Sequence, residues 1–168
     1  MTANDLADKV ARAMLAAEGT GPAWGVAIDE VREGYARIRM ALTPAMLNGH
    51  GIAHGGMIFA LADTAFAYAC NSRNLRTVAA QASIVFLDAA KEGETLIAEA
   101  QEQALAGRSG VYNVSVRAAD GRAIAEFQGY SRSLRRIDRP HLVTPDLIRG
   151  PPSLKGVGKK MDAGSSPA

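Results

Sequence analysis

Residues 48–71 read NGHGIAHGGMIFALADTAFAYACN, a loop rich in glycine and histidine that runs into one long apolar segment. The apolar part predicts a helix from Gly55 to about Ser72, roughly 27 Å long at 1.5 Å per residue. Because this helix is apolar on nearly all sides, we expect it to be buried over most of its surface. We therefore expect the rest of the chain to form a sheet that wraps around it.

The predicted helix carries a single charged residue, Asp63. A charged group that is buried without a partner costs about several kcal/mol or shifts its pKa, so a lone acid on an apolar helix needs an explanation. We interpret Asp63 and the loop before the helix as a candidate active site. The alternative is a structural acid that bonds to a backbone group or faces a solvent channel.

The remaining sequence is dominated by strand-like patterns. We expect a first helix over residues 3–18 and strands over residues 24–30, 35–42, 78–87, 94–104, 111–117 and 122–134. The continuous apolar run at 78–87 is typical of a strand that is covered on both faces. The last four strands predict an antiparallel meander. Together with the central helix they predict an α+β fold, with one helix packed on one sheet.

Composition and length limit the classes of protein to consider. The chain has 168 residues, of which 48% are hydrophobic, as expected of one globular domain. A single cysteine excludes an intramolecular disulfide and a cysteine-based metal cluster, and we expect a cytoplasmic protein. We predict neither a signal peptide nor a membrane span, because no N-terminal apolar run follows basic residues and no stretch of about 18 apolar residues exists.

Charge divides the chain near residue 136. Residues 1–136 hold 14 basic and 14 acidic residues, whereas residues 137–168 hold five basic and three acidic ones, which accounts for the net charge of +2. A neutral body argues against nucleic-acid binding, which needs a concentrated basic face. The last segment also holds five of the seven prolines. We therefore expect a domain over residues 1–136 and a disordered or loosely packed tail over 137–168.

Three motifs resemble one enzyme family. Residues 48–74, GRSGVYNVSV at 107–116 and AEFQGYSRSL at 125–134 resemble the hotdog-fold acyl-CoA thioesterases of the phenylacetic-acid-degradation PaaI group. The most specific part is His-Gly-Gly followed by an acid at the ninth position after His54. The resemblance covers about residues 5–135. It implies a hotdog fold, in which an antiparallel sheet wraps around one long central helix.

The resemblance also implies an activity and an assembly. The expected reaction is hydrolysis of aryl-acetyl (phenylacetyl-type) or medium-chain acyl-CoA to the free acid and CoA. No metal or cofactor is expected. The resemblance implies a homodimer with shared active sites, or a dimer of dimers, that is, a homotetramer. Asp88 and Ala89 stand where close relatives have Arg-Pro, and Val85 replaces an acid, so the substrate preference is expected to differ.

Roles for single residues follow from the same resemblance. The catalytic acid of the family matches Asp63, the oxyanion donor matches the backbone N–H of Gly55, and the orienting amide matches Asn48. The motif histidine matches His54, and Arg108 matches a basic position near the CoA phosphates. The predicted catalytic residues are thus Asn48, His54, Gly55 and Asp63, and the predicted substrate- or CoA-binding residues are Gly56, Phe59, Arg108 and Ser109. Arg73, Arg76, Arg132 and Arg135 are further phosphate candidates on charge alone, and Leu47, Phe59 and Phe66 are candidates for the pocket lining.

The residue types suit this chemistry. A helix N-terminus offers free N–H groups and a partial positive charge, and Gly55 and Gly56 let a carbonyl approach closely. Such a donor is worth roughly 2.7–4 kcal/mol. Asp63 either deprotonates a water or attacks the thioester directly to give an anhydride. Less specific roles stay open: the glycines as a tight junction, Asn48 as a turn former with Gly49, His54 as a cap rather than a base, and Arg108 as a solvated turn residue.

Spacing along the helix leads to a prediction about two chains. Asp63 lies eight residues after Gly55, which is about 12 Å along the helix axis. The two groups therefore cannot meet at one carbonyl within a chain, but they can meet if two helices pack antiparallel across a twofold axis. Two other functions stay open: a hotdog hydratase or dehydratase that uses His54 and Asp63 as an acid–base pair, and a non-enzymatic acyl-CoA-binding regulatory module.

Overall fold

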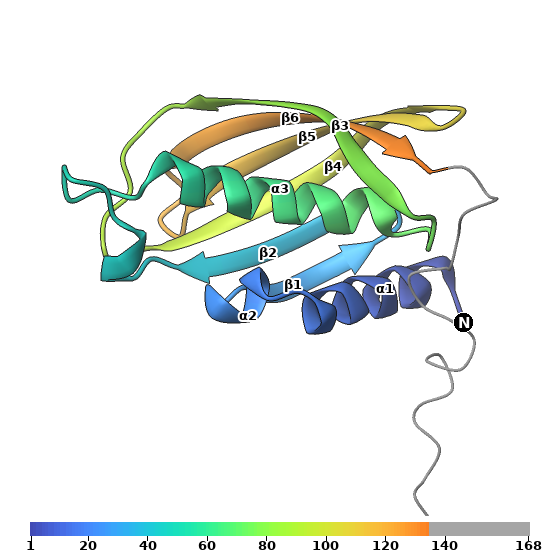
Figure 1. Ribbon diagram of the computed structural model, residues 1–168, viewed down its shortest axis with the longest axis horizontal. Coiled ribbons are helices and arrows are strands. Elements are labelled where there is room, and N and C mark those ends of the chain that lie inside the picture. Colours follow the sequence, from blue (N-terminus) through green and yellow to red (C-terminus); the bar gives the residue numbers. More distant parts are fainter. Residues whose placement is uncertain (135–168) are drawn as a thin grey trace, which may run out of the picture.

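The computed structural model describes residues 1–134, which form a six-stranded antiparallel sheet with helices on one side (Figure 1). In chain order the elements are α1 (Ala3–Ala17), α2 (Thr20–Ala23), β1 (Ala27–Arg32), β2 (Tyr35–Ala41), the 3₁₀ turn η1 (Pro44–Met46), α3 (Gly55–Asn71), β3 (Thr77–Phe86), β4 (Thr95–Ala106), β5 (Ser109–Ala118) and β6 (Ala123–Ser133). The predicted α+β class is confirmed. The predicted tail and its boundary at residue 136 lie outside the described residues.

Helix α3 runs across the sheet and forms the centre of the core (Figure 1). Its buried side chains include Ile58, Leu61, Ala62, Ala65, Phe66, Tyr68 and Ala69. Burying one large apolar side chain contributes about 1.5–3 kcal/mol, so this face anchors the helix. The ring of Phe66 fits because β6 has glycine beneath it: a Cβ on Gly129 would lie 2.9 Å from that ring.

The inner face of the sheet follows the predicted two-residue alternation. Leu96, Ala98 and Ala100 of β4 are fully buried, as are Tyr112, Val114 and Val116 of β5. The two strands are paired in register, with Ala98 opposite Val116, so these side chains form one continuous layer beneath α3. The intervening polar residues face the other side of the sheet. The period-2 pattern therefore identified the core face of these strands correctly.

Strand β3 differs from its prediction in two ways. The order β1-β2-β4-β5-β6-β3 places it at the edge of the sheet, paired with β6 and not with β4. Only β4, β5 and β6 form the predicted meander. The strand is also largely exposed rather than covered on both faces, with Val85 60% and Phe86 50% accessible. An apolar run shows that a strand is suited to burial, but strand order decides whether anything within the described chain covers it.

Smaller differences occur near the N-terminus. The short helix α2 occupies residues where a break after α1 was expected, and β1 begins at Ala27 instead of Trp24. Helix α1 packs beside α3, and the buried Tyr68 hydroxyl donates a 2.5 Å hydrogen bond to Glu18 at the end of α1. None of the helices within residues 1–134 is both long and apolar enough to cross a membrane.

Candidate active site

The loop before α3 is shaped by Asn48. The Asn48 backbone N–H donates to the carbonyl of Ile52 (2.8 Å), and its side-chain Oδ1 accepts from the N–H of His50 (2.9 Å). Gly51 adopts a φ of +73°, which glycine tolerates at no steric cost. Asn48 therefore forms the turn, as the alternative role predicted. Its Nδ2 group makes no hydrogen bond within residues 1–134, which leaves a donor for a ligand.

Exchanging Asn48 for aspartate separates these two roles. Asn48→Asp keeps the oxygen that accepts from His50, so we expect the melting temperature to change little. It removes the Nδ2 donor, so we expect kcat/KM to fall by about tenfold, the effect of one hydrogen bond of roughly 1.4 kcal/mol. Thiol release from acyl-CoA and thermal unfolding measure the two effects. Unchanged kinetics would assign Asn48 to the turn alone.

His54 caps the helix and leaves one backbone donor free. Its Nδ1 accepts from the N–H of Gly56 (2.9 Å), and its carbonyl accepts from the N–H groups of Met57 and Ile58 (2.8 and 3.3 Å). Of the first four helix N–H groups, only that of Gly55 has no partner within residues 1–134. Because Nδ1 of His54 is an acceptor, the neutral ring carries its proton on Nε2. This geometry favours a capping role over a base.

An open cleft of about 490 Å³ lies at this end of α3. It is lined by Asn48, Ile52, Ala53, Gly55, Ile58, Phe86, Leu87, Asp88 and Ala89. The Phe86 ring stands beside the free donor, since a Cβ on Gly55 would lie 3.1 Å from its Cζ. The predicted residues Asn48 and Gly55 thus share one cleft. Its mainly apolar walls suit a ligand with an apolar group.

The aromatic lining differs from the prediction. Phe66 is 1% exposed and packs on Tyr112 and Phe127, with ring centroids 5.3 and 5.9 Å apart, so its assignment to the pocket is wrong. Phe59 is half-buried and packs edge-to-face on Phe127. The sequence reasoning missed Phe86 and Leu87, because it treated the whole run at 78–87 as core. Their place at the end of that run, beside Asp88, was the available signal.

Asp63 lies in the middle of α3, away from this cleft. Its side chain is half-buried and has no hydrogen-bond or ion-pair partner within residues 1–134. Burial raises its pKa above the ordinary value of 3.8. Its charge, together with burial as the larger cause, raises the pKa of the Cys70 thiol to about 12, so Cys70 stays protonated. An unpaired carboxylate with a raised pKa is suited to act as a base or nucleophile.

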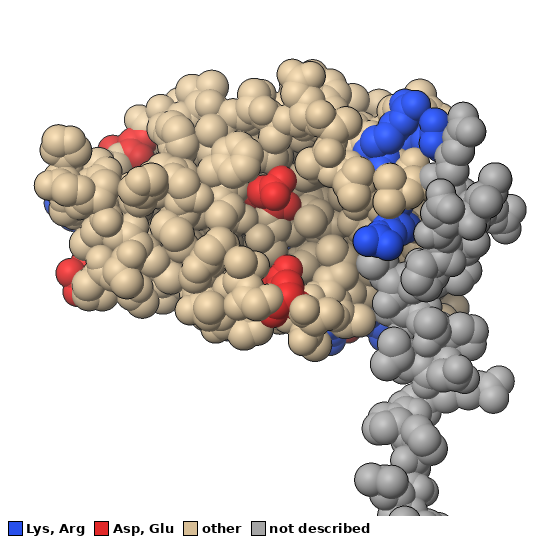
Figure 2. Space-filling view, viewed as in Figure 1, with Lys and Arg blue, Asp and Glu red and all other residues tan. Residues whose placement is uncertain are grey.

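Of the predicted substrate- or CoA-binding residues, Gly56 and Phe59 lie in the first turns of α3, whereas Arg108 and Ser109 lie at its opposite end. Arg108 is exposed in the turn between β4 and β5, and Ser109 begins β5. Arg132 joins them, because its Nη1 donates to the Ser109 Oγ (2.8 Å). Figure 2 shows that this face of the molecule is mostly uncharged, with isolated acidic groups near its middle and basic groups gathered at one end. The predicted site residues therefore occupy three places along one helix about 25 Å long.

No group of three or more histidine, cysteine, aspartate or glutamate side chains within residues 1–134 is placed to hold a metal ion. The chemistry available at the cleft and on α3 comes from a backbone donor, a carboxylate and an amide. These groups match the needs of acyl transfer, in which an oxyanion must be stabilised and a proton moved.

Comparisons with known proteins agree with this reading. The sequence model of the Thioesterase superfamily matches residues 50–125, which include the cap, the free donor and Asp63. The acyl-coenzyme A thioesterase PaaI of Escherichia coli is 41% identical over 124 residues, which are 74% of this chain and 89% of the relative. The chain belongs to the thioesterase superfamily, in its PaaI group. This membership confirms the predicted hotdog fold and the predicted class of thioester hydrolase.

Solved structures place the chain in the same group. The structure of the E. coli PaaI protein, from the phenylacetic acid degradation operon, has a TM-score of 0.78 and 39% identity and covers 80% of this chain and 97% of its own. A variant of the Thermus thermophilus PaaI protein has a TM-score of 0.67 and 32% identity, with 70% of this chain and 100% of the variant covered. A hypothetical thioesterase of Streptococcus pneumoniae, solved with coenzyme A, has a TM-score of 0.63 and 25% identity, with 65% and 85% covered.

Proposed function

We propose that this protein hydrolyses acyl-CoA thioesters, with an aryl-acetyl or medium-chain acyl group, to the free acid and CoA. The observation that carries the proposal is the N–H of Gly55, which faces a largely apolar cleft and is the one donor in the first turn of α3 without a partner among residues 1–134. The E. coli relative is named an acyl-coenzyme A thioesterase, and the S. pneumoniae relative was solved with coenzyme A. Both support the choice of substrate class.

The proposed reaction uses two protein groups and a water. The thioester oxygen accepts a hydrogen bond from the Gly55 N–H, which stabilises the charge that develops on it by roughly 2.7–4 kcal/mol. Asp63 takes a proton from a water whose oxygen attacks the carbonyl carbon. The tetrahedral intermediate then expels the CoA sulfur, which receives that proton. In the alternative route the Asp63 carboxylate attacks first, and water hydrolyses the resulting anhydride.

We further propose that each site is shared between two chains. The exposed apolar side chains of β3, among them Val78, Val85 and Phe86, supply a surface that a second copy can cover. If the twofold axis passes near Phe59, midway between Gly55 and Asp63, each Gly55 lies level with the Asp63 of the other copy. The same operation carries Arg108, Ser109 and Arg132 toward the other copy's cleft, where they can bind CoA phosphates.

A mixing experiment tests this shared site. Gly55→Pro and Asp63→Asn chains, each inactive as homodimers, are co-expressed with different tags and purified as a mixture. If the sites are shared, every heterodimer contains one intact site, so random pairing restores about a quarter of the parental activity. If each chain holds its own site, both sites of the heterodimer are defective and no activity returns. Parental chains carrying the same two tags are the control.

Thiol release from a panel of acyl-CoAs tests the activity itself. We expect turnover with phenylacetyl-CoA and medium-chain acyl-CoAs. Tight acyl-CoA binding without release of CoA would favour the binding module instead. Addition of water to an enoyl-CoA without thiol release would favour the hydratase, in which His54 and Asp63 act as the acid–base pair.

A further inference from the structure

One wall of the cleft is formed by residues 86–89, at the end of β3. Phe86 ends β3 at the sheet edge, and residues 87–94 lead to β4. The N–H groups of Leu87 and Asp88 donate to the carbonyl of Ile124 (2.8 and 3.3 Å), and the Ala90 carbonyl accepts from the N–H of Ala53 (2.8 Å). The bond between Ala53 and Ala90 ties the segment that follows the wall to the loop that leads directly into α3.

Arg122, in the turn between β5 and β6, holds the same wall from the side. Its Nη1 donates to the Asp88 carboxylate (3.1 Å) and to the Ala89 carbonyl (2.6 Å), and its Nη2 donates to Glu94 (2.5 Å). The Nε of Arg122 donates to the carboxylate of Asp120 (3.5 Å), which holds the guanidinium on its other side. Arg122 thus contacts the wall at Asp88 and Ala89 and the following segment at Glu94, with a planar fork that holds its partners in fixed directions.

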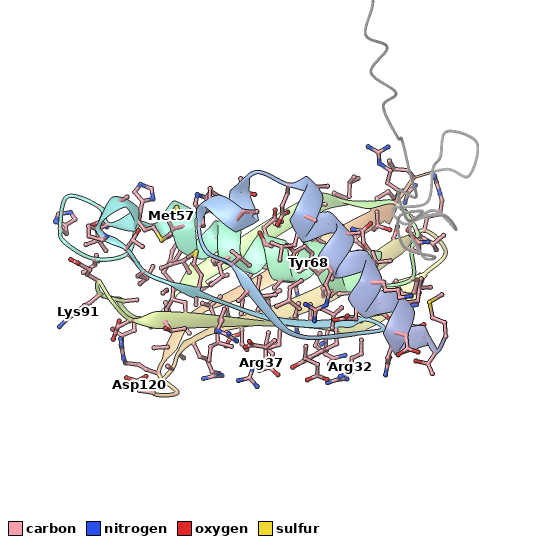
Figure 3. The ribbon with its side chains drawn as sticks, turned by 90° about the horizontal axis from the view of Figure 1, so that it is seen from below. Arg32, Arg37, Met57, Tyr68, Lys91 and Asp120 are labelled. Carbon is pink, nitrogen blue, oxygen red and sulfur yellow. The ribbon has the colours of Figure 1, made fainter. Side chains whose placement is uncertain are left out.

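The position of this cluster connects it to the free donor. Figure 3 shows Asp120 and Lys91 at the same end of the molecule as Met57, which lies in the first turn of α3. The backbone N–H of Ala89 and the Arg122 guanidinium lower the pKa of Asp88, so this ion pair persists at neutral pH. Phe86, three residues before Ala89, stands against Gly55. A shift of the wall therefore moves an aromatic ring that borders the reacting carbonyl.

We propose that Arg122 is a positioning residue that holds the 86–89 wall against Gly55 and thereby restricts the cleft to aryl-acetyl and medium-chain acyl groups. This inference rests on the proposed acyl-CoA hydrolysis. Arg122 lies outside the cleft lining and acts only through the segment it holds. When the clamp is lost, the wall is free to move outward. Aryl-acetyl groups then lose alignment with the Gly55 donor, whereas long-chain acyl groups gain room.

The test is acyl selectivity in Arg122→Met, which keeps an unbranched apolar side chain and removes the fork. We expect kcat/KM for phenylacetyl-CoA to fall by about tenfold or more, because small displacements of reacting groups cost large factors in rate. We expect kcat/KM for the long-chain substrate palmitoyl-CoA to be retained or raised, so the ratio of the two values changes by at least about tenfold. Arg122→Lys keeps the charge but loses the fork, so its ratio of kcat/KM values should lie between those of the parent and Arg122→Met.

Arg117→Met is the matched control, since Arg117 lies near the end of β5 and, in the described part of the chain, pairs only with Glu126 on the exposed surface. We expect this substitution to leave kcat/KM unchanged for both substrates. Equal losses for both substrates in Arg122→Met, or kinetics like those of Arg117→Met, would overturn the inference. If Arg122→Met does not fold, an unchanged ratio in Arg122→Lys would overturn it as well. If the parent releases no thiol from either substrate, the proposed function fails and the inference falls with it.

Discussion

Replacing Asp63 by asparagine lowers kcat by about 10²- to 10⁴-fold, the usual contribution of a positioned general base. Asparagine has nearly the same size and sits as well in the half-buried site, but it can neither accept a proton from water nor attack a carbonyl. Thiol release from phenylacetyl-CoA measures the loss. Asp8→Asn, at a partly exposed position on α1, is the control and should be as active as the parent. Full turnover by a folded Asp63→Asn protein would remove Asp63 from the mechanism.

The same substitution should not cost stability. Burial raises the pKa of Asp63, so the folded protein binds this proton more tightly than the unfolded chain does. The contribution of Asp63 to the free energy of unfolding is therefore greatest below the ordinary pKa of 3.8 and is lost as pH rises through the raised value. Asparagine does not ionise, so at about pH 7 Asp63→Asn should melt at the parental temperature or above it. This advantage should shrink as the pH is lowered.

The raised pKa also sets the expected pH profile. Because the ionised carboxylate is the base, kcat/KM of the parent should rise with pH through the pKa of Asp63 and then level off. The acidic limb should therefore lie above pH 3.8. The residual activity of Asp63→Asn should lack this limb. A limb that persists in the variant would assign the titration to another group.

Gly55→Pro removes the proposed oxyanion donor and should lower kcat by about 10²- to 10³-fold. Proline is well suited to the first position of a helix, where the N–H makes no intrahelical bond. His54 already has the extended backbone that the residue before a proline prefers, with φ −63° and ψ 131°. The Gly55 N–H has no partner within residues 1–134, so the fold loses no described hydrogen bond. We therefore expect the variant to fold.

Gly55→Ala is the matched control for the added bulk. Both variants introduce a Cβ that meets the Phe86 ring at 3.1 Å, but only alanine retains the N–H. The difference in kcat between the two variants isolates the donor, whereas the difference between alanine and the parent reports the displaced ring. Equal kcat values for alanine and proline would contradict an oxyanion role for this N–H. A circular-dichroism melt shows whether each variant is folded.

Much of the fold could be predicted because its signals are local. The apolar run after His-Gly-Gly predicted α3 to within one residue, since helix formation and burial depend on neighbours a few positions apart. The alternation in β4 and β5 identified their buried faces for the same reason. Asp63 could be selected as a candidate because a lone acid is conspicuous on an apolar helix. The free Gly55 donor could only be suspected, since a helix start offers several N–H groups.

Tertiary structure decided which backbone N–H group at the start of α3 remains free. The answer depends on the orientation of the His54 ring and on which carbonyls of the loop accept hydrogen bonds. The same holds for the edge position of β3, for Phe86 in the cleft and for the burial of Phe66. Each depends on contacts between segments far apart in the chain. By itself the sequence determined one buried helix, its capped start and its single acid. Only the packing of remote strands around that helix decided what the start of the helix faces.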